Sequence, residues 1–431
     1  MNTKKSLLRT AMVVVAVLLG GLVVVGVVYA AAVTVDSFDN GDENLLITSG
    51  SPPTVYGLYD GTGILGGERD SVLTWMAGSS GYLRLTVDNS NSNIFSYSAD
   101  PQVQGWASVT WDGNDNLTST LTYTGLNSVD LTDSGSNNGL LIAIVFDDLQ
   151  ADLTFKIYTD QNNWSYRTIR LPGAADGTPA HMDIFLPFSS FTTGGGSGAT
   201  FSNVGAVVME LDGTVAAGVD VQIDFIEVSN AREYGDLPSS YSVISAYHIP
   251  QGLRLGKIVD AETTYQASTG ANGDDNNPSG FDDEDGVQPL LLPWPAGGTG
   301  YVGIDRYGCP SFPAGCYING WIDWNNDGDF NDALEHIVNN TQVYGDGSSY
   351  PSFTTPGSYS NGYYYARFRI CPTSTGCDDP GESPVTNGEV EDYRWWLSPT
   401  AVELSSFSAS YRDRRVTVRW ETASELDLVG F

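Results

Sequence analysis

The stretch YLRLTVDN, residues 82–89, alternates apolar and polar side chains along its length. Leu83, Leu85 and Val87 fall on one side of an extended chain, and the polar residues between them fall on the other. Successive side chains of a β-strand point to opposite faces, so this spacing predicts a strand with one buried and one solvated face.

The same period of two recurs in DLTFKIYTD, residues 152–160, and in VDVQIDFIEV, residues 219–228. GLLIAIVF, residues 139–146, is apolar without alternation, which is typical of a central strand covered on both faces. Clusters of Gly, Asn, Asp and Ser separate these runs, and no helical period of useful length occurs. We therefore predict an all-β, multidomain β-sandwich chain whose residues 33–230 form a jelly roll.

Four short motifs support this prediction: VDSFD (35–39), GILGGERD (63–70), VTWDG (109–113) and VGAVVMELDG (204–213). In this order they resemble a jelly-roll domain that is common in secreted bacterial proteins and is similar in shape to carbohydrate-binding modules. The resemblance implies an extracellular glycan as a possible ligand.

Sugar binding by such a domain needs aromatic rings that stack on the apolar face of a sugar. The candidate rings are Trp75, Trp106, Trp111, Trp164, Tyr56 and Tyr59. Trp111 is in phase with Val109, so we predict that it lies in the core. Trp106 and Trp164 stand among Gly and Asn residues, so we predict that they lie in loops and bind the glycan.

The charge of the chain restricts its partners. Its 431 residues carry a formal net charge of -33. Such a field repels nucleic acids and anionic membrane surfaces, so neither is expected as a partner. Cations are the better candidates, although an acidic surface also serves solubility alone.

The first 32 residues have the order of a secretory signal peptide. Lys4, Lys5 and Arg9 precede an apolar stretch at residues 11–28, and small residues follow at 30–32. The alternative is an uncleaved membrane anchor, since the apolar stretch is long enough to span a thin bilayer. We expect cleavage, and a protein that is secreted or held at the bacterial surface.

The cysteines lie in one part of the chain, at Cys309, Cys316, Cys371 and Cys377. Export to an oxidising compartment favours disulfides. We predict that Cys309 pairs with Cys316 and Cys371 with Cys377, because each pair brackets a short loop. A zinc site is the alternative, but neither spacing suits zinc ligands and no histidine is close in sequence.

A second unit begins after Asn230, where the composition becomes rich in Asp, Asn, Gly and Tyr. Its landmarks, in order, are YGDLPSSY, LGKIVDAE, GDDNNPSGFDDEDGV, GWIDWNNDGDFNDALEHI, YYYARFRIC and NGEVEDYRWW. Together they resemble the GEVED domain, and we assign it residues 231–397. The resemblance implies a β-sandwich module of an extracellular multidomain protein, with no catalytic activity attached.

WIDWNNDGDFND, residues 321–332, carries oxygen-bearing side chains at alternate positions, followed by Gly328. Calcium binds six to eight oxygens with flexible geometry, which such a loop supplies. An EF-hand needs a glutamate where this loop has Leu334, so it is not an EF-hand. The predicted calcium ligands are Asp323, Asn325, Asp327, Asp329, Asp332 and Glu335. The alternative is a metal-free hairpin turn.

Two other acidic clusters occur, at residues 282–285 and around Glu389 and Glu391. The first is typical of a solvated loop. A carboxylate from each cluster is a possible additional ligand for the calcium loop.

No sequence motif indicates catalysis. The three histidines, His181, His248 and His336, are widely spaced, and no HExxH, P-loop or convincing serine triad occurs. We predict a non-enzymatic, adhesive or structural protein that binds calcium and has a glycan or another surface protein as partner. The alternative is the carbohydrate-binding region of a larger polysaccharide-acting enzyme.

Residues 398–431 resemble the opening strands of a fibronectin type III domain. RVTVRW places Val416, Val418 and Trp420 on one face of a strand. A complete sandwich of this kind needs about seven strands, and this segment supplies two at most. We expect an incomplete segment that is disordered by itself.

Overall fold

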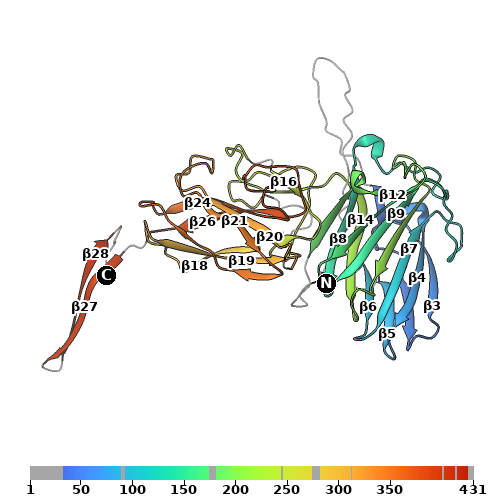
Figure 1. Ribbon diagram of the computed structural model, residues 1–431, viewed down its shortest axis with the longest axis horizontal. Helices are drawn as coiled ribbons and strands as arrows, with labels where there is room; N and C mark the ends of the chain where they lie inside the picture. Colours follow the sequence, from blue (N-terminus) through green and yellow to red (C-terminus); the bar gives the residue numbers. More distant parts are fainter. Residues whose placement is uncertain are drawn as a thin grey trace, which may run out of the picture.

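The computed structural model describes residues 33–88, 93–173, 181–243, 246–273, 282–311, 313–399, 402–412 and 415–425. Within these ranges the chain is all-β, as predicted, with only three short 3-10 turns besides its strands. No helix in the described part is long and apolar enough to cross a membrane. The strands form two sandwiches side by side and a C-terminal hairpin (Figure 1).

The first sandwich consists of two seven-stranded sheets. One runs β11 (Met182–Pro187), β8 (Gly139–Asp147), β14 (Asp220–Ser229), β6 (Ile94–Ala99), β5 (Tyr82–Asp88), β2 (Glu43–Thr48), and β1 (Val33–Asp36) also pairs with β14. The other runs β12 (Thr192–Gly195), β10 (Trp164–Leu171), β9 (Ala151–Tyr158), β13 (Ala206–Asp212), β7 (Gln104–Trp111), β4 (Glu68–Ala77), β3 (Thr54–Asp60). We call the second of these the far sheet, because it faces away from the second sandwich (Figure 1).

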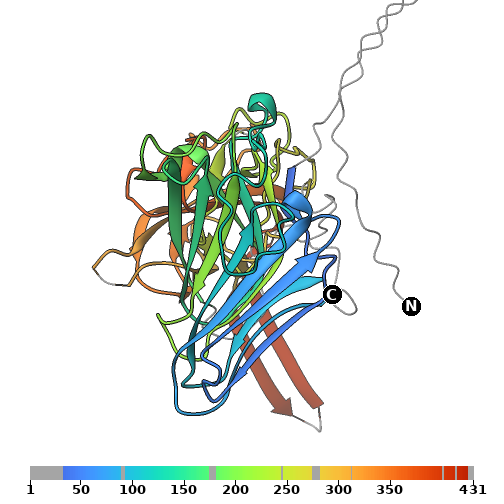
Figure 2. The ribbon, with the colours of Figure 1, turned by 90° about the vertical axis from the view of Figure 1, so that its right-hand side faces the viewer.

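The apolar positions of the alternating strands meet between these two sheets. Leu83, Leu85 and Val87 of β5 are buried in one continuous core with Phe155 of β9, as their period predicted. The polar side chains of the far sheet point outward. Figure 2 looks onto this sandwich from the side opposite the second one, with its N-terminal strands in front.

Strand β8 is buried on both faces, as its unbroken apolar run predicted. Leu140 and Ile142 belong to the core of the first sandwich, whereas Leu141 faces outward. Leu141 packs in a separate apolar cluster that includes Ile249 and Ala261 of the second unit. The second unit therefore supplies the cover that makes β8 a central strand.

The backbone also joins the two units along β11. The Asp183 N–H donates to the Val259 carbonyl, and the Phe185 N–H donates to the Pro250 carbonyl, both at 2.9 Å. The edge of β11 is thus paired rather than left open to solvent, which removes a site for unwanted strand pairing.

The second sandwich packs a five-stranded sheet against a four-stranded one. The first contains β17 (Arg254–Leu255), β18 (Val287–Leu290), β19 (Thr299–Tyr307), β22 (Gly347–Ser349) and β23 (Ser352–Thr354). The second runs β21 (His336–Val343), β20 (Cys316–Ile322), β24 (Gly362–Cys371), β26 (Glu389–Leu397). A small sheet of β15 (Glu233–Tyr234), β16 (Tyr247–Ile249) and β25 (Val385–Thr386) lies beside them. Trp294, Ile304 and Phe368 lie fully buried in the shared core.

The two predicted disulfides are confirmed, Cys309 with Cys316 and Cys371 with Cys377. Tyr317, next to Cys316 in β20, pairs with Cys371 of β24, so both bridges lie at the same end of one sheet. Each bridge closes a short surface loop there.

We expect intact mass with and without reductant to show no free thiol in the oxidised protein, because all four sulfurs are paired. Peptide mapping without reductant should yield only the two local linkages. A fragment linking Cys309 to Cys371 would contradict this pairing.

The C-terminal strands β27 (Val402–Arg412) and β28 (Arg415–Glu425) pair with each other as an antiparallel hairpin. The structure therefore differs from the disorder predicted for this segment, because the backbone groups of each strand bond to the other. Phe407, Val416 and Trp420 remain largely exposed, as expected of two strands without a sandwich around them.

Candidate functional site

The predicted calcium loop connects β20 to β21 on the second sandwich. Asp323 follows the last residue of β20 and is fully buried. Its carboxylate accepts the N–H of Gly328 at 3.0 Å, the N–H of Asp327 at 3.3 Å and the hydroxyl of Tyr241 at 2.6 Å. These bonds bend the loop around Asp323, and Gly328 permits the bend with a φ of 92°.

The side chain of Asn325 links two carboxylates of the loop. Its side-chain amide nitrogen donates to Asp327 at 3.0 Å and to Asp332 at 2.5 Å. This NH₂ group thus bridges two carboxylates. Rotation of the amide by 180° would present its oxygen there instead, as a metal ligand requires.

Glu335 closes the loop, next to β21. It is 1% exposed, and its carboxylate accepts the N–H groups of Trp324 and Asp332, each at 3.0 Å. Burial, together with the charges of Asp323 and Asp332, raises the pKa of Glu335 to about 7. The loop thus directs several carboxylates toward one another without a basic partner among the described residues.

Of the six predicted ligands, Asp323, Asn325, Asp327, Asp332 and Glu335 form one hydrogen-bonded network. Asp329 joins it only through its N–H to Asp327, and its own carboxylate accepts the N–H of Asn331. The all-oxygen donor set suits calcium. The same contacts also satisfy a metal-free turn, so calcium binding stays a prediction.

The carboxylates of the GEVED string are turned inward, away from any shared role with this loop. Glu389 accepts the Leu255 N–H, while Glu391 accepts the Gly286 N–H at 2.8 Å and the Tyr393 hydroxyl at 3.0 Å. Both glutamates are at most 1% exposed, and burial raises the pKa of each well above its usual value. They hold the segments before β18 and around β17 against β26.

Asp392 and Gly388 complete the structural role of this string. Asp392 binds Arg367 of β24 through both carboxylate oxygens, at 2.7 and 2.8 Å, and also accepts the Leu237 N–H. Gly388 has a φ of 116°, and a Cβ there would lie 2.0 Å from the Ile370 carbonyl oxygen. Only glycine fits this position, because any side chain would separate β26 from β24.

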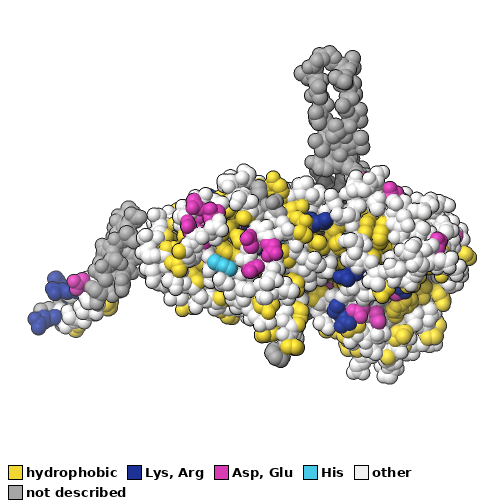
Figure 3. Space-filling view, turned by 45° about the horizontal axis from the view of Figure 1, so that its top comes forward, with side chains coloured by type: hydrophobic (Ala, Val, Ile, Leu, Met, Phe, Trp, Pro, Cys, Tyr) yellow, Lys and Arg dark blue, Asp and Glu magenta, His cyan; other side chains and the backbone are white. Residues whose placement is uncertain are grey.

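The acidic segment at residues 282–285 joins the GEVED glutamates rather than the calcium loop. Asp285 accepts the Lys257 N–H at 2.9 Å, and its charge is among those that raise the pKa of Glu391. The predicted sharing of a ligand between this segment and residues 323–335 stays a prediction. Figure 3 shows acidic side chains in separate groups on the visible face of the second sandwich.

Trp106 and Trp164 lie on strands β7 and β10, so their prediction as loop residues was wrong. In β7 the inward neighbours of Trp106 are Gly105, which has no side chain, and Ala107, which has only a methyl group, so the period of two is hard to recognise in the sequence. Both tryptophans are half-buried and lie on the outer face of the far sheet. They remain candidates for stacking on a sugar.

The other aromatic candidates divide between core and surface. Trp111 is fully buried, as predicted, and its Nε1 donates to Asp36 at 2.9 Å. Trp75 packs partly against the core, and Tyr59 is half-buried opposite Arg69. Tyr56 is 52% exposed on the same outer face as Trp106.

The sequence reasoning missed the residues that join these aromatic rings into one surface. The strand register aligns Tyr56, Val72, Ser108, Glu210, Thr154 and Thr168 in one row across the far sheet. The next rows add two ion pairs, Lys156 with Glu210 at 2.6 Å and Arg170 with Asp152. The alternation within each strand identifies these residues as outward-facing, but their alignment in one row depends on the order of strands in the sheet.

The histidines have structural partners. His248 is fully buried, and Arg369 donates to its Nε2 at 2.9 Å. Burial and the Arg369 charge lower the pKa of His248 well below its usual value. His336 stacks on Trp321, with ring centroids 4.6 Å apart. None of these contacts has the geometry of a nucleophile and its base.

Several solved structures share limited similarity with this chain. A family 11 carbohydrate-binding module from Clostridium thermocellum, in complex with a mixed-linked tetrasaccharide, is 12% identical, with a TM-score of 0.21 over 44% of this chain and 96% of that one. An exo-β-agarase is 10% identical, with a TM-score of 0.21 over 43% of this chain and 24% of that one. A Bacteroides uniformis β-glucuronidase is 8% identical, with a TM-score of 0.20 over 73% of this chain and 28% of that one. TM-scores this low carry no argument about function.

No curated protein sequence matches the chain. The model of one protein family, the GEVED domain, matches residues 317–395, from β20 to β26. This match covers the calcium loop, the Arg367 strand and the GEVED string itself. It contains the last three of the six sequence landmarks, and the assignment of residues 231–316 to the same domain stays a prediction. The resemblance is confirmed where the model matches: residues 317–395 of this chain match the GEVED domain.

Proposed function

We propose that this protein is a non-enzymatic, secreted or cell-surface bacterial protein that holds an extended glycan on the far sheet of its first sandwich. The GEVED domain serves beside it as a calcium-stabilised structural or adhesive module. One observation carries the glycan proposal: half-buried tryptophans stand toward opposite ends of a sheet face that also presents hydroxyl, carboxylate and basic groups.

The polar groups alone would be an ordinary solvated sheet face. The aromatic rings distinguish this face from an ordinary solvated one. Trp164 stacks on Tyr158 with ring centroids 5.5 Å apart, and Tyr166 lies 5.9 Å from Trp164. At the other end Trp106 stands opposite Asp212. Aromatic faces beside carboxylates suit sugars, which offer C–H groups on one side and hydroxyl groups at their edges.

The spacing of the two tryptophans indicates the size of the ligand. Strands β9 and β13 lie between β10 and β7, which separates the two rings by about 14 Å across the sheet. Trp164 is level with Tyr158 of β9, and Trp106 is level with Asp152 of the same strand. The two rings are therefore also about 20 Å apart in the direction of the strands. One sugar ring cannot reach both, so the proposed ligand is a chain of sugars.

Binding to a panel of soluble polysaccharides, followed by isothermal titration with oligosaccharides of increasing length, tests this proposal. We expect affinity to rise with length until the chain contacts both rings. Trp106→Ala and Trp164→Ala should each weaken binding about 10- to 30-fold, since a truncated tryptophan anchor costs about 1.4–2 kcal/mol.

Trp396→Ala is the matched control, because Trp396 is 57% exposed on the GEVED domain, away from the far sheet. It should leave the affinity unchanged. Absence of binding to every polysaccharide, or equal losses in all three variants, would contradict the proposed glycan face.

Calcium binding by the GEVED domain rests on the Asn325 amide described above. The Asn325 NH₂ group bridges the Asp327 and Asp332 carboxylates, with the buried carboxylates of Asp323 and Glu335 in the same loop. In the proposed site, a calcium ion would replace this NH₂ group between the carboxylates. Coordination by calcium would offset the repulsion among these carboxylates and fix the loop. Export through the signal segment at residues 1–32, which lies outside the described residues, would bring the loop to a calcium-rich environment.

A further inference from the structure

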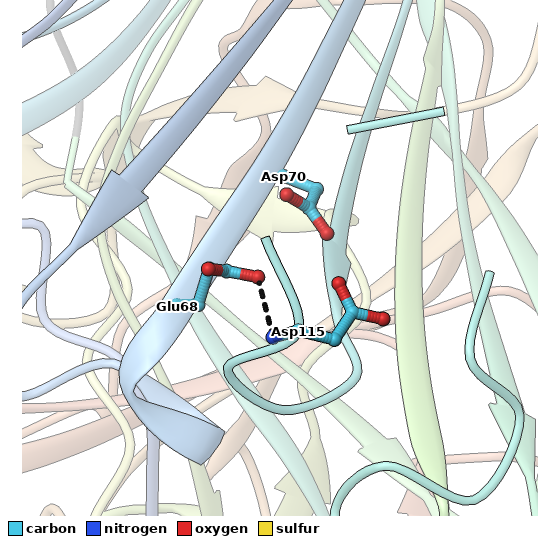
Figure 4. A group of neighbouring side chains, drawn as sticks. All are labelled: Glu68, Asp70 and Asp115. Carbon is cyan, nitrogen blue, oxygen red and sulfur yellow. Dashed lines mark hydrogen bonds between the residues drawn. The ribbon is translucent and has the colours of Figure 1, made fainter. Parts of the chain in front are cut away.

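A second group of carboxylates lies in the first sandwich, remote from the GEVED domain. Glu68 and Asp70 stand at the start of β4, and Asp115 lies in the connection that follows β7. One oxygen from each of these three residues lies within 4.8 Å of the other two. Figure 4 shows the three carboxylates pointing toward one another from the strand and from the loop beside it.

Two buried carboxylate oxygens in this group have no hydrogen-bond partner. Asp70 is 4% exposed and Asp112 is 1% exposed, and the Oδ1 atom of each is unsatisfied. No lysine or arginine forms an ion pair with Glu68, Asp70, Asp112 or Asp115 in the described part of the chain. An unpaired buried charge costs several kcal/mol, so these carboxyl groups either take up protons or have their charge offset by a cation.

Mutual repulsion is strong in the absence of such a cation. Burial, followed by the charges of Asp112 and Glu68, raises the pKa of Asp70 to about 8. Burial also raises the pKa of Asp112 to about 6.

We propose that Glu68, Asp70 and Asp115 bind a calcium ion, with Asp112 adding its charge beside them. The oxygen separations suit this ion, since 4.8 Å is about twice a calcium–oxygen bond of about 2.4 Å. The donors are all carboxylate oxygens, without the histidine or cysteine that zinc prefers. Magnesium is disfavoured because it requires a stricter octahedral geometry and gives up its water reluctantly.

Hydrogen bonds hold the connection after β7 against these carboxylates. Glu68 accepts the N–H groups of Asp115 and Asn116, both at 3.1 Å. The Thr122 N–H donates to Asp112, and its hydroxyl donates to Asp115. The ion would therefore tie residues 112–122 to β4.

Two glycines bring the ends of this connection together. A Cβ on Gly125 would lie 1.7 Å from the Asp112 carbonyl oxygen, and one on Gly113 would lie 2.5 Å from the Gly125 carbonyl oxygen. Only two glycines permit so close an approach of the backbone. The closure buries Glu68, Asp70 and Asp112, whereas Asp115 stays partly exposed.

Hydrogen exchange of the purified protein, with calcium and with chelator, tests the site locally. The amides of Asp115, Asn116 and Thr122 donate to the carboxylates concerned, so their exchange reports on this loop alone. Calcium at 100 times its dissociation constant should slow their exchange about 100-fold, if opening of the loop releases the ion. Calcium-independent exchange at these three amides would overturn the proposal.

Asp70→Asn supplies the decisive variant. It removes one ligand charge and its repulsion, so the calcium-free variant should unfold at a temperature no lower than that of the calcium-free wild type. The calcium effect on the three amides should be lost, together with one bound calcium in a titration. Asp327→Asn is the matched control on the GEVED domain, and it should leave the response of these amides unchanged. A full calcium response in Asp70→Asn would overturn the assignment.

Discussion

Replacing Arg367 by methionine is expected to lower the free energy of unfolding of the GEVED domain by about 3–5 kcal/mol. The Arg367 and Asp392 side chains are both fully buried and bind each other through two hydrogen bonds. Removal of the guanidinium leaves Asp392 as an uncompensated buried charge. It also removes the donors to the Val243 and Pro380 carbonyls, at 2.7 and 2.9 Å.

Denaturant unfolding, followed by tryptophan fluorescence, measures this loss. Arg394→Met is the matched control on β26, because Arg394 is exposed and lies 3.8 Å from the centroid of the Tyr363 ring without a buried partner charge. It should change stability by less than about 1 kcal/mol. The double variant Arg367→Met with Asp392→Leu should recover part of the loss, since it removes both charges. A loss below 1 kcal/mol in Arg367→Met would contradict the assigned role of the GEVED aspartate.

Calcium is expected to stabilise the GEVED domain by about 2.7 kcal/mol when present at about 100 times its dissociation constant. For a domain of this size the midpoint of thermal unfolding should rise by about 5–10 °C. The physical reason is that coordination replaces the repulsion among Asp323, Asp327, Asp332 and Glu335. Magnesium should have a smaller effect, because it demands tighter geometry.

Scanning calorimetry in calcium, magnesium and chelator measures this shift, in the Asp70→Asn background so that only one proposed site remains. Asp327→Ala with Asp332→Ala should abolish the calcium effect while keeping the fold, because both residues are exposed. Asp329→Asn should retain it, since the Asp329 carboxylate accepts the Asn331 N–H instead of joining the other carboxylates of the loop. Equal midpoints in calcium and chelator before any loop substitution would leave residues 323–335 as a metal-free hairpin turn.

The sequence was sufficient for the local features of this protein. The alternation in residues 82–89 identified a strand and its buried face, because the period of a strand is visible in a single segment. The two disulfides followed from short loops between cysteines, whose ends are close whatever the rest of the fold. The hydrogen-bonded loop at residues 323–335 is local in the same sense, since its polar residues lie within 13 positions of each other in sequence, whereas calcium binding there stays a prediction.

The sequence by itself thus determined strands, faces, bridges and the GEVED landmarks, whereas the tertiary structure alone decided which side chains share a site. Glu68 and Asp70 meet Asp115 only because β4 pairs with β7. The GEVED acids looked like ligands, but the first half of β26 is buried on both faces, and its acids bind backbone N–H groups and Arg367. Period and spacing fix the direction of a side chain relative to its own strand, but its partners depend on sheet order and on long-range packing.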